Sequence, residues 1–296
     1  MKYINPSFSE ICELDFYTKI ALVAHNCYQV DRNDKPKEFV KRLIGFKHLA
    51  MIEHYHFVAD ISKSFYQELI NFNSPFLILV NKNDKYYVNF TLRILLEDYE
   101  SKKSKVLEGL ISLLPDDIIE LFPNFTKSIS FNGKLLTEDE VNNLPYDLFY
   151  KLKDVSLKII TDRGVTHELV RHRLASYAQE STRYCNYAKN KFGNELTFIT
   201  PLDYDLHKQD YDKTFSFIEK EYIYMINDLR MTAEMARAIL PNKLKASIII
   251  TANIEEFDKI FALRLDPHAH PDIRLVFRPI KEYFINKGYL QNGKTF

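Results

Sequence analysis

Hydrophobic residues recur at helical spacing over several stretches of the chain. The clearest stretch is 208–229, where apolar side chains stand three or four positions apart and therefore share one helix face. The same spacing predicts several further helices. They cover 14–28, 36–47, 92–113 and 253–263, with one that ends near Arg173, one that stops at Pro241 and one that starts at Pro271. The chain is therefore expected to be rich in helices.

Shorter apolar runs with β-branched and aromatic residues predict strands. They lie at 55–61, 155–161 and 247–252, and a β-hairpin is predicted from 76–80 and 86–91. Residues 115–150 are polar, contain three prolines and show weak periodicity, so we expect irregular surface structure there. No clear linker divides the chain. These patterns predict an α+β fold, with helices around a small antiparallel or mixed sheet, in a single domain over residues 1–296.

The composition is that of an ordinary globular protein. Of the 296 residues, 46% are hydrophobic and 27% are charged. Forty basic side chains balance forty acidic ones, whereas a dedicated nucleic-acid-binding protein usually carries a basic excess. The three cysteines are odd in number and far apart, which favours a reducing compartment. No apolar run is long enough to span a bilayer. We therefore expect a soluble, cytoplasmic protein that binds small molecules rather than nucleic acid or membranes.

The positions of the glycines exclude one common phosphate-binding motif. No two of the seven glycines are two positions apart, as a G-x-G-x-x-G turn requires. If the protein binds dinucleotide phosphates, side chains such as arginine must hold them.

Such side chains are concentrated in residues 171–184, Arg-His-Arg-Leu-Ala-Ser-Tyr-Ala-Gln-Glu-Ser-Thr-Arg-Tyr, which we call the Arg-rich segment. Arginine keeps its charge and can bind phosphate or carboxylate through two parallel hydrogen bonds. Cations are also favourable at a helix C-terminus, which offers a purely structural alternative for Arg171 and Arg173. However, the run from Ser176 to Tyr184 lacks the periodicity of a solvent-exposed face. The segment predicts a site for a phosphorylated, hydrogen-bonding small molecule.

Histidine pairs raise the alternative of a metal site. His167 and His172 are five positions apart, which places them about 140° apart around a helix and does not match the four-residue spacing of zinc proteases. Two further pairs have the i, i+2 spacing that puts both side chains on one face of a strand. They are His54 with His56, and His268 with His270. No nearby cysteine or carboxylate completes a ligand set in either segment, so we predict no metal.

The Arg-rich segment resembles the signature of the flavin-dependent thymidylate synthases, in which Arg-His-Arg is followed, after seven residues, by Ser. Other blocks look like this family in the same order. They are His48 to His54 with the strand that follows, Ala236-Arg237-x-x-Leu240-Pro241, Thr251-x-Asn253, and 263–274. The resemblance covers about residues 20–60 and 155–287. Residues 62–154 look like an enlarged insertion relative to shorter members, and we call this stretch the insertion.

The resemblance implies FAD as the cofactor and dUMP as the substrate. The residues implied to contact FAD are His48, Glu53, Arg171, His172, Arg173, Arg264 and His268. Those implied to hold dUMP are Glu168, Arg171, Gln179, Glu180, Ser181, Arg183, Lys245 and Arg274. Arg274 is also the implied catalytic residue, because a fixed cation beside the uracil ring would stabilise its ionised, nucleophilic form.

The resemblance further implies a reaction and an assembly. In the family, NADPH reduces FAD, methylenetetrahydrofolate supplies a one-carbon unit to dUMP, and the flavin hydride completes the methyl group of dTMP. Members are homotetramers in which FAD and the nucleotide lie where subunits meet.

Two positions depart from the family pattern. Ala50 stands where many members have a flavin-contacting Ser or Thr, and Ser247 stands where some have an arginine that reaches the nucleotide phosphate. We hypothesise that Lys245 replaces that arginine.

Two other classes of function stay open. One is a metal-dependent nucleotide phosphohydrolase that uses the histidine pairs. The other is a single-strand nucleic-acid-binding protein that combines the arginines with 19 tyrosines and 22 phenylalanines as stacking platforms.

Overall fold

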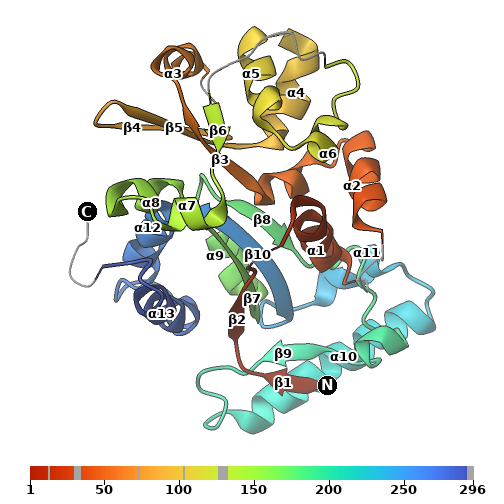
Figure 1. The fold of residues 1–296 in the computed structure, drawn as a ribbon. Coiled ribbons are helices and arrows are strands. Elements are labelled where there is room, and N and C mark those ends of the chain that lie inside the picture. Colours follow the sequence, from red (N-terminus) through yellow and green to blue (C-terminus); the bar gives the residue numbers. More distant parts are fainter. Residues whose placement is uncertain (13, 30–34, 73, 103, 126–132, 292–296) are drawn as a thin grey trace.

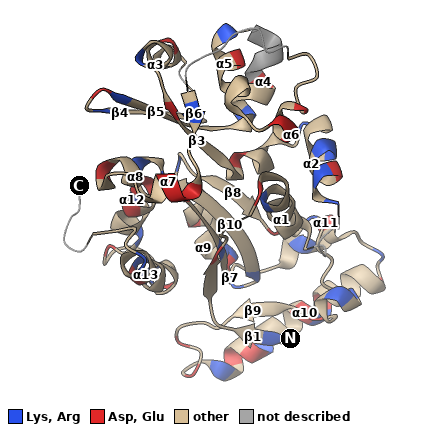
Figure 2. Cartoon of the chain, viewed as in Figure 1, with Lys and Arg blue, Asp and Glu red and all other residues tan. Residues whose placement is uncertain are grey.

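The structure, a computed structural model, describes residues 1–12, 14–29, 35–72, 74–102, 104–125 and 133–291. It confirms a mixed α+β architecture with small, mostly antiparallel sheets. Acidic and basic residues are interspersed along the elements, in keeping with the balanced charge (Figure 2). None of the described helices is long and apolar enough to cross a membrane.

The central sheet has four antiparallel strands in the order β2-β7-β10-β8 (Figure 1). These are β2 (Ser7–Glu10), β7 (Asp154–Asp162), β10 (Lys245–Asn253) and β8 (Ser176–Gln179). The longest pairing joins β7 to β10, with Ile159 opposite Ile248. Both strands were predicted from their apolar, β-branched runs, and burial of those side chains on both faces accounts for the pattern.

Helices cover both faces of the central sheet. Ile248 and Ile250 pack against α12 (Ile254–Arg264) and α13 (Pro271–Asn286), in a core rich in phenylalanine. Ile249 points to the opposite face because side chains alternate along a strand, and there it meets Val23 of α1 (Phe16–Tyr28). Asn253 caps α12 as predicted, its side chain accepting a hydrogen bond from the Glu256 backbone N–H.

A second antiparallel sheet, in the order β4-β5-β3-β6, carries most of the insertion (Figure 1). Its strands are β4 (Leu77–Lys82), β5 (Lys85–Thr91), β3 (His56–Ile61) and β6 (Gly133–Leu135). The predicted hairpin is confirmed, and Asn83 and Asp84 both take the positive φ that a tight two-residue turn requires. The helices associated with this sheet are α2 (Pro36–Gly45), α3 (Lys63–Ile70), α4 (Leu92–Lys102), α5 (Lys105–Leu113) and the 3₁₀ helix η1 (Leu49–His54).

A smaller unit pairs the N-terminus with the region after the Arg-rich segment. Strands β1 (Lys2–Ile4) and β9 (Thr197–Ile199) are parallel and pack on α10 (Lys208–Asn227), where the rings of Phe198 and Phe215 stack at 4.4 Å. The chain then continues through α11 (Ala233–Ala236) and η3 (Arg237–Ile239), and η2 (Asn190–Phe192) lies upstream of β9. Helix α10 matches the predicted stretch of helical spacing closely.

Several predictions of local structure were wrong. The described part of residues 115–150, which leaves out 126–132, is not irregular, because it contains three short helices as well as β6. These helices are α6 (Asp116–Ile119), α7 (Glu138–Asn142) and α8 (Tyr146–Leu152). A reciprocal capping box between Thr137 and Glu140 starts α7. The single helix predicted for 92–113 is two helices, α4 and α5, with Ser104 in extended conformation between them.

Candidate ligand-binding site

The Arg-rich segment begins in a turn and continues as a strand. Helix α9 (Arg163–Leu169) ends before Arg171, not near Arg173 as predicted, and Leu174 takes a positive φ of 67° in the link that follows. Residues Ser176–Gln179 then form β8 against β10. This strand was not predicted, because four residues of mixed polarity carry little periodicity. Pairing with the buried strand β10 fixes the position of the segment on the central sheet.

Three of the predicted site residues meet at the end of α9. Arg264, the last residue of α12, donates from Nη1 to Glu168 Oε2 at 2.8 Å and from Nη2 to the Glu168 carbonyl at 2.8 Å. Its Nε donates to His172 Nε2, also at 2.8 Å, so that ring nitrogen acts as an acceptor. Burial, with the charge of Arg264, lowers the pKa of His172 and favours the neutral ring. We call Glu168, His172 and Arg264 the Arg264 cluster.

The two outer arginines of the Arg-His-Arg triplet remain available to a ligand. Arg171 and Arg173 are both exposed, and neither forms a side-chain hydrogen bond or ion pair with a residue that the structure describes. They flank His172 in the turn beside the Arg264 cluster. The turn therefore presents two permanent positive charges to solvent next to a neutral imidazole.

Glu53 lies where the central sheet meets the second sheet. Its Oε2 accepts a hydrogen bond from Ser176 Oγ at 2.9 Å, and its Oε1 forms an ion pair with Arg93 of α4. Ser176 belongs to the Arg-rich segment, so this hydrogen bond joins the block around Glu53 to that segment. His48 stands exposed just before η1. Arg93 was missed by sequence reasoning, which transferred no role to the insertion.

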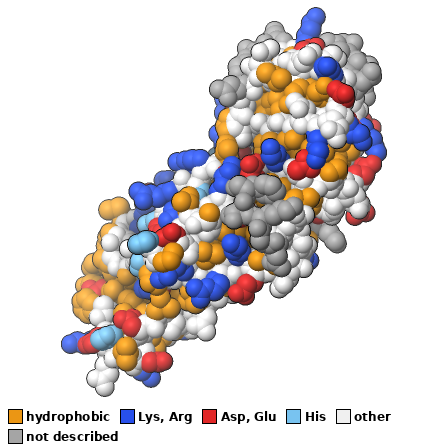
Figure 3. All heavy atoms as spheres, turned by 90° about the vertical axis from the view of Figure 1, so that its left-hand side faces the viewer, with side chains coloured by type: hydrophobic (Ala, Val, Ile, Leu, Met, Phe, Trp, Pro, Cys, Tyr) orange, Lys and Arg blue, Asp and Glu red, His pale blue; other side chains and the backbone are white. Residues whose placement is uncertain are grey.

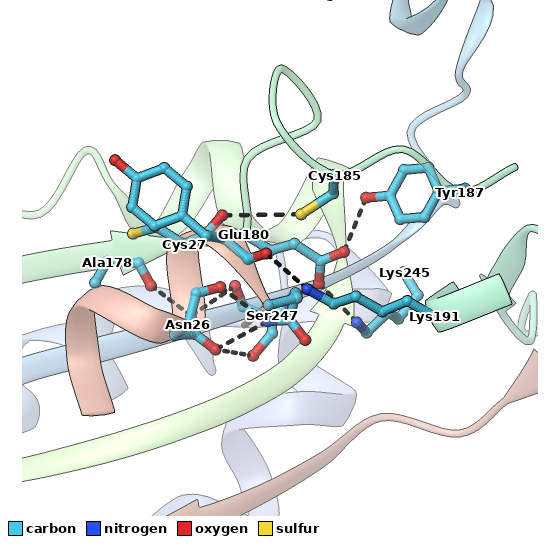
Figure 4. A network of polar contacts seen from close by, with 11 residues as sticks. Asn26, Cys27, Ala178, Glu180, Cys185, Tyr187, Lys191, Lys245 and Ser247 are labelled. Atoms are coloured by element: carbon cyan, nitrogen blue, oxygen red, sulfur yellow. Dashed lines mark hydrogen bonds and ion pairs between the residues drawn. The ribbon is translucent and has the colours of Figure 1, made fainter. Parts of the chain in front are cut away.

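The downstream part of the Arg-rich segment is held by the protein itself. Gln179 donates to Thr166 Oγ1 of α9 at 2.8 Å. Glu180 is fully buried and accepts from Tyr187 Oη at 2.8 Å, from Lys245 Nζ at 2.6 Å and from the Ser247 backbone N–H at 3.2 Å (Figure 4). Lys245 is thus placed beside a buried carboxylate, a partner that the sequence did not reveal.

A second set of hydrogen bonds ties helix α1 to this region. Asn26 Nδ2 donates to the carbonyls of Ala178 and Ser247, and Ser247 Oγ is bonded to Asn26 Oδ1 (Figure 4). The Ser181 backbone N–H donates to the carbonyl of Cys27 at 2.9 Å. Asn26 was missed because a single buried asparagine on an apolar helix carries no motif. These contacts fix the backbone on either side of Glu180.

Arg183 lies at the exposed end of the segment. Its Nε forms an ion pair with Glu234 of α11 at 2.8 Å, and its guanidinium lies over the ring of Tyr184 at 5.3 Å. Both partners of the ion pair are about half exposed. Such pairs are worth between about 0 and 1 kcal/mol, so Arg183 can exchange Glu234 for an anionic ligand at little cost.

Arg274, on the first turns of α13, carries an unsatisfied donor. Its Nε is buried and has no hydrogen-bond partner among the described residues. An unpaired buried donor is costly, so it is a natural position for an acceptor from a ligand or another chain.

His268 lies in the turn that precedes α13, almost fully exposed, and is hydrogen-bonded to Asp266. On the face of the molecule in Figure 3, Lys and Arg side chains gather beside histidines.

A cavity of about 380 Å³ opens beside Glu168, where α9 and α13 begin. It is lined by residues including His167, Lys243 and Asp272. Lys243 Nζ bonds to Asp162 Oδ2 at 2.9 Å and also pairs with Asp272, so one cation joins the two helix starts. Sequence reasoning missed Lys243, since its two partners are 81 and 29 residues away.

The histidine pair of His54 and His56 is hydrogen-bonded to other side chains of the protein. His54 is fully buried, and its Nδ1 lies 2.8 Å from Thr251 Oγ1, while His56 Nδ1 lies 2.7 Å from Asn89 Oδ1. Within the described part of the chain, no three His, Cys, Asp or Glu side chains form a group that could hold a metal ion.

Comparison with known proteins finds a family that part of this chain resembles. Residues 151–287 match the model of the family described as "thymidylate synthase complementing protein". Over 116 residues the chain is 35% identical to the flavin-dependent thymidylate synthase of Pyrococcus abyssi, covering 38% of this chain and 47% of that protein. The corresponding enzyme of Pyrococcus furiosus is 37% identical over 117 residues, with the same coverage.

A third relative matches a longer stretch. The flavin-dependent thymidylate synthase of Sulfolobus acidocaldarius is 28% identical over 158 residues, covering 51% of this chain and 59% of its own length. The chain spans about half the length of the curated relatives it matches. The matched region contains the Arg-rich segment, the Arg264 cluster and Arg274. These matches show that the chain is similar to the flavin-dependent thymidylate synthases over residues 151–287, just under half of its length.

Proposed function

We propose that the protein is a flavin-dependent thymidylate synthase, which converts dUMP to dTMP with a one-carbon unit from methylenetetrahydrofolate and NADPH as reductant. The observation that carries the proposal is the pair of exposed arginines without protein partners, Arg171 and Arg173, beside the Arg264 cluster in the region that matches the family. Phosphorylated ligands supply the anions that such arginines lack.

The residues present fit FAD as the cofactor. Its diphosphate needs cations, and Arg171 and Arg173 are exposed and unpaired within the described chain. The neutral His172 and the carboxylate of Glu53 offer hydrogen-bond partners of different kinds next to them. His48, Arg264 and His268 complete the proposed flavin-binding set. When bound, FAD supplies the redox chemistry of the reaction, while these side chains bind and orient it.

The proposed nucleotide site uses the remaining residues of the segment. Arg183 and Ser181 are assigned to the phosphate of dUMP, because the ion pair of Arg183 with Glu234 is exposed and weak. Glu168, Arg171 and Gln179 bind the rest of the nucleotide. Glu180 is fully buried, so it acts through Lys245, whose ammonium group it holds. A phosphate contact from Lys245 remains a prediction.

Arg274 is the proposed catalytic residue. Its buried Nε lacks a partner in the described chain, which supports a role that a ligand completes. A guanidinium near the uracil ring stabilises negative charge on that ring most strongly where water is excluded. We expect Arg274→Ala to reduce turnover more than it reduces dUMP binding, measured by steady-state kinetics and calorimetry. Equal losses in both would assign Arg274 to substrate anchoring instead.

The assembly is proposed from the same resemblance. We propose a cytoplasmic homotetramer in which neighbouring subunits complete each site. Sedimentation of the purified protein, with and without FAD, measures the number of chains per particle.

The first test of the proposed function is a visible absorption spectrum of the purified protein. The expected result is a flavin band that bleaches on addition of NADPH in the presence of dUMP without oxygen. Formation of dTMP on addition of methylenetetrahydrofolate then completes the reaction. A colourless protein that takes up no added FAD would contradict the proposal.

A further inference from the structure

The insertion reaches the proposed flavin site through one side chain. Glu53 has two partners from separate parts of the chain, Ser176 of the Arg-rich segment and Arg93 of the insertion. Arg93 is the second residue of α4, which follows β5 directly. The only described cation paired with the Glu53 carboxylate therefore belongs to a region outside the match to the family.

Three neighbours fix the Arg93 guanidinium. Its Nη1 pairs with Glu53, its Nε donates to Glu97 at 2.8 Å, and its plane lies over the ring of Phe76 with 4.7 Å between the guanidinium carbon and the ring centroid. Phe76 comes just before β4, and Glu97 is one turn further along α4. A planar, permanently charged fork held on three sides has little freedom to turn away.

This arrangement also fixes the Glu53 side chain. Arg93 holds Oε1 and Ser176 holds Oε2, so the carboxylate is fixed at both oxygens. The side chain of Glu53 is 15% exposed and that of Arg93 is 27% exposed, so solvent screens their interaction only in part. Arg93 therefore does two things at once: it orients Glu53 and it balances the negative charge of that carboxylate.

We propose that Arg93 is a positioning residue for the flavin, by which the insertion sets both the orientation and the net charge of Glu53. This inference rests on the proposed function, since it requires that Glu53 lies against FAD. The physical reason is electrostatic. Reduced flavin carries an added negative charge, and an uncompensated carboxylate beside it disfavours that charged form.

The proposal predicts the effect of removing the positive charge while keeping the bulk of the side chain. Arg93→Met retains an extended side chain over Phe76 but leaves Glu53 without its cation. We expect FAD binding to weaken by about tenfold, as for coupled residues of one ion-pair network. The midpoint potential of the bound flavin should become more negative, because reduction now adds charge beside an unbalanced carboxylate.

A double variant separates charge balance from general loosening of the structure. Arg93→Met combined with Glu53→Gln removes both charges, so the midpoint potential should return toward the wild-type value even if FAD affinity does not recover. In Arg93→Lys the midpoint potential should stay close to the wild-type value, because the charge remains. The affinity for FAD should be retained only in part, because the planar fork is lost. A merely structural role of Arg93 would not restore the potential in the double variant.

The matched control is another ion-paired cation of the insertion. Lys82 of β4 pairs with Asp147 of α8 and does not contact Glu53, so Lys82→Met should change neither the potential nor the affinity. Circular dichroism of each variant verifies folding, and Arg93→Lys serves as the test if Arg93→Met fails to fold.

The outcomes distinguish this inference from the proposed function. A wild-type protein that binds no FAD contradicts the proposed function itself. A wild-type protein that binds FAD, with Arg93→Met matching it in affinity and potential, overturns only the role of Arg93.

Discussion

The start and the middle of the Arg-rich segment use their polar side chains in opposite ways. At the start, Arg171 and Arg173 are exposed and have no ion-pair partner within the described chain. Further along, Gln179 and Glu180 are bonded to Thr166, Tyr187 and Lys245, and Glu180 is fully buried. One motif of fourteen residues thus contains charges that the protein leaves unpaired and charges that it pairs internally.

This difference separates side chains that stabilise the fold from side chains that are free to bind a ligand. A charge that is buried with its partner is desolvated when the chain folds. Removing one of the two charges leaves the other buried and unpaired, which destabilises the fold. An exposed charge without a partner contributes little to folding and can be used for a ligand. Substitutions at the two places should therefore differ in kind: those in the middle should change stability, and those at the start should change binding.

The largest expected effect is on stability in the buried middle of the segment. Glu180→Ala leaves the Lys245 ammonium and the Tyr187 hydroxyl without their acceptor. Breaking one partner of a buried pair costs about 3–5 kcal/mol, which urea unfolding measures as a lower free energy of unfolding. Lys245→Met combined with Glu180→Leu removes both charges, and it should recover part of the loss. An unchanged unfolding midpoint for Glu180→Ala would remove the contrast between the start and the middle of the segment.

The next effect is on ligand binding at the exposed start of the segment. Arg171→Ala should weaken binding of FAD and of dUMP by about 1.5–3 kcal/mol each, the value of a hydrogen bond to a charged group. Its unfolding midpoint should stay at the wild-type value, because no described residue pairs with this side chain. Titration calorimetry and thermal unfolding measure the two quantities. A loss of stability without a loss of binding would reverse the assignment.

A pH dependence sharpens the comparison for buried polar groups. Burial, with the nearby charge of Lys19, lowers the pKa of His54 from 6.5 to about 3. Below pH 6.5, His54 takes up a proton in the unfolded chain but not in the folded protein. The contribution of His54 to the free energy of unfolding is therefore complete above that pH and is lost as the pH falls toward 3. We expect a loss of about 2 kcal/mol between pH 7.5 and pH 5 from this group.

The His54 contribution is measured by difference. Urea unfolding of wild type and His54→Gln at both pH values isolates it, because the other histidines are common to both proteins. The variant should lose less stability than wild type on acidification, and equal losses would contradict a neutral, buried His54.

The smallest expected effect is at the half-exposed ion pair between Arg183 and Glu234. Glu234→Gln should change the free energy of unfolding by less than about 1 kcal/mol and should leave dUMP affinity equal or higher, since Arg183 is released. Arg183→Ala should weaken dUMP binding instead, as expected if it pairs with phosphate. Similar losses of affinity in both variants would argue that the pair itself shapes the site.

The sequence predicted long regular elements well and short ones poorly. Helix α10 has sustained helical periodicity, and strands β7 and β10 have β-branched apolar runs, so the sequence alone indicates each of them. Strand β8 has four residues, and only its partner β10 makes it a strand. Helix α7 could have been found, because Thr137-Glu138-Asp139-Glu140 is a capping-box sequence.

For the candidate site, the residue types and their spacing in the Arg-rich segment predict an anion site, and this stays a prediction. The partners of those residues could not be read in this way: Lys245 lies 65 positions from Glu180, and Arg93 lies 40 positions from Glu53. Such pairs depend on strand register and helix packing, which periodicity does not encode.

The contact between Glu53 and Ser176 has a consequence for how the chain folds. The two residues are 123 positions apart, and the insertion supplies most of that separation. Without the insertion the loop closed by this contact would shrink to about 30 residues, yet the entropy of closure depends only on the logarithm of length, so the saving is about 1 kcal/mol. A long segment can therefore be accommodated between two halves of a binding site for little free energy, provided that it folds on its own sheet. The main consequence is kinetic: the site can close only after a distant part of the chain has folded, and its formation should be among the late events of folding.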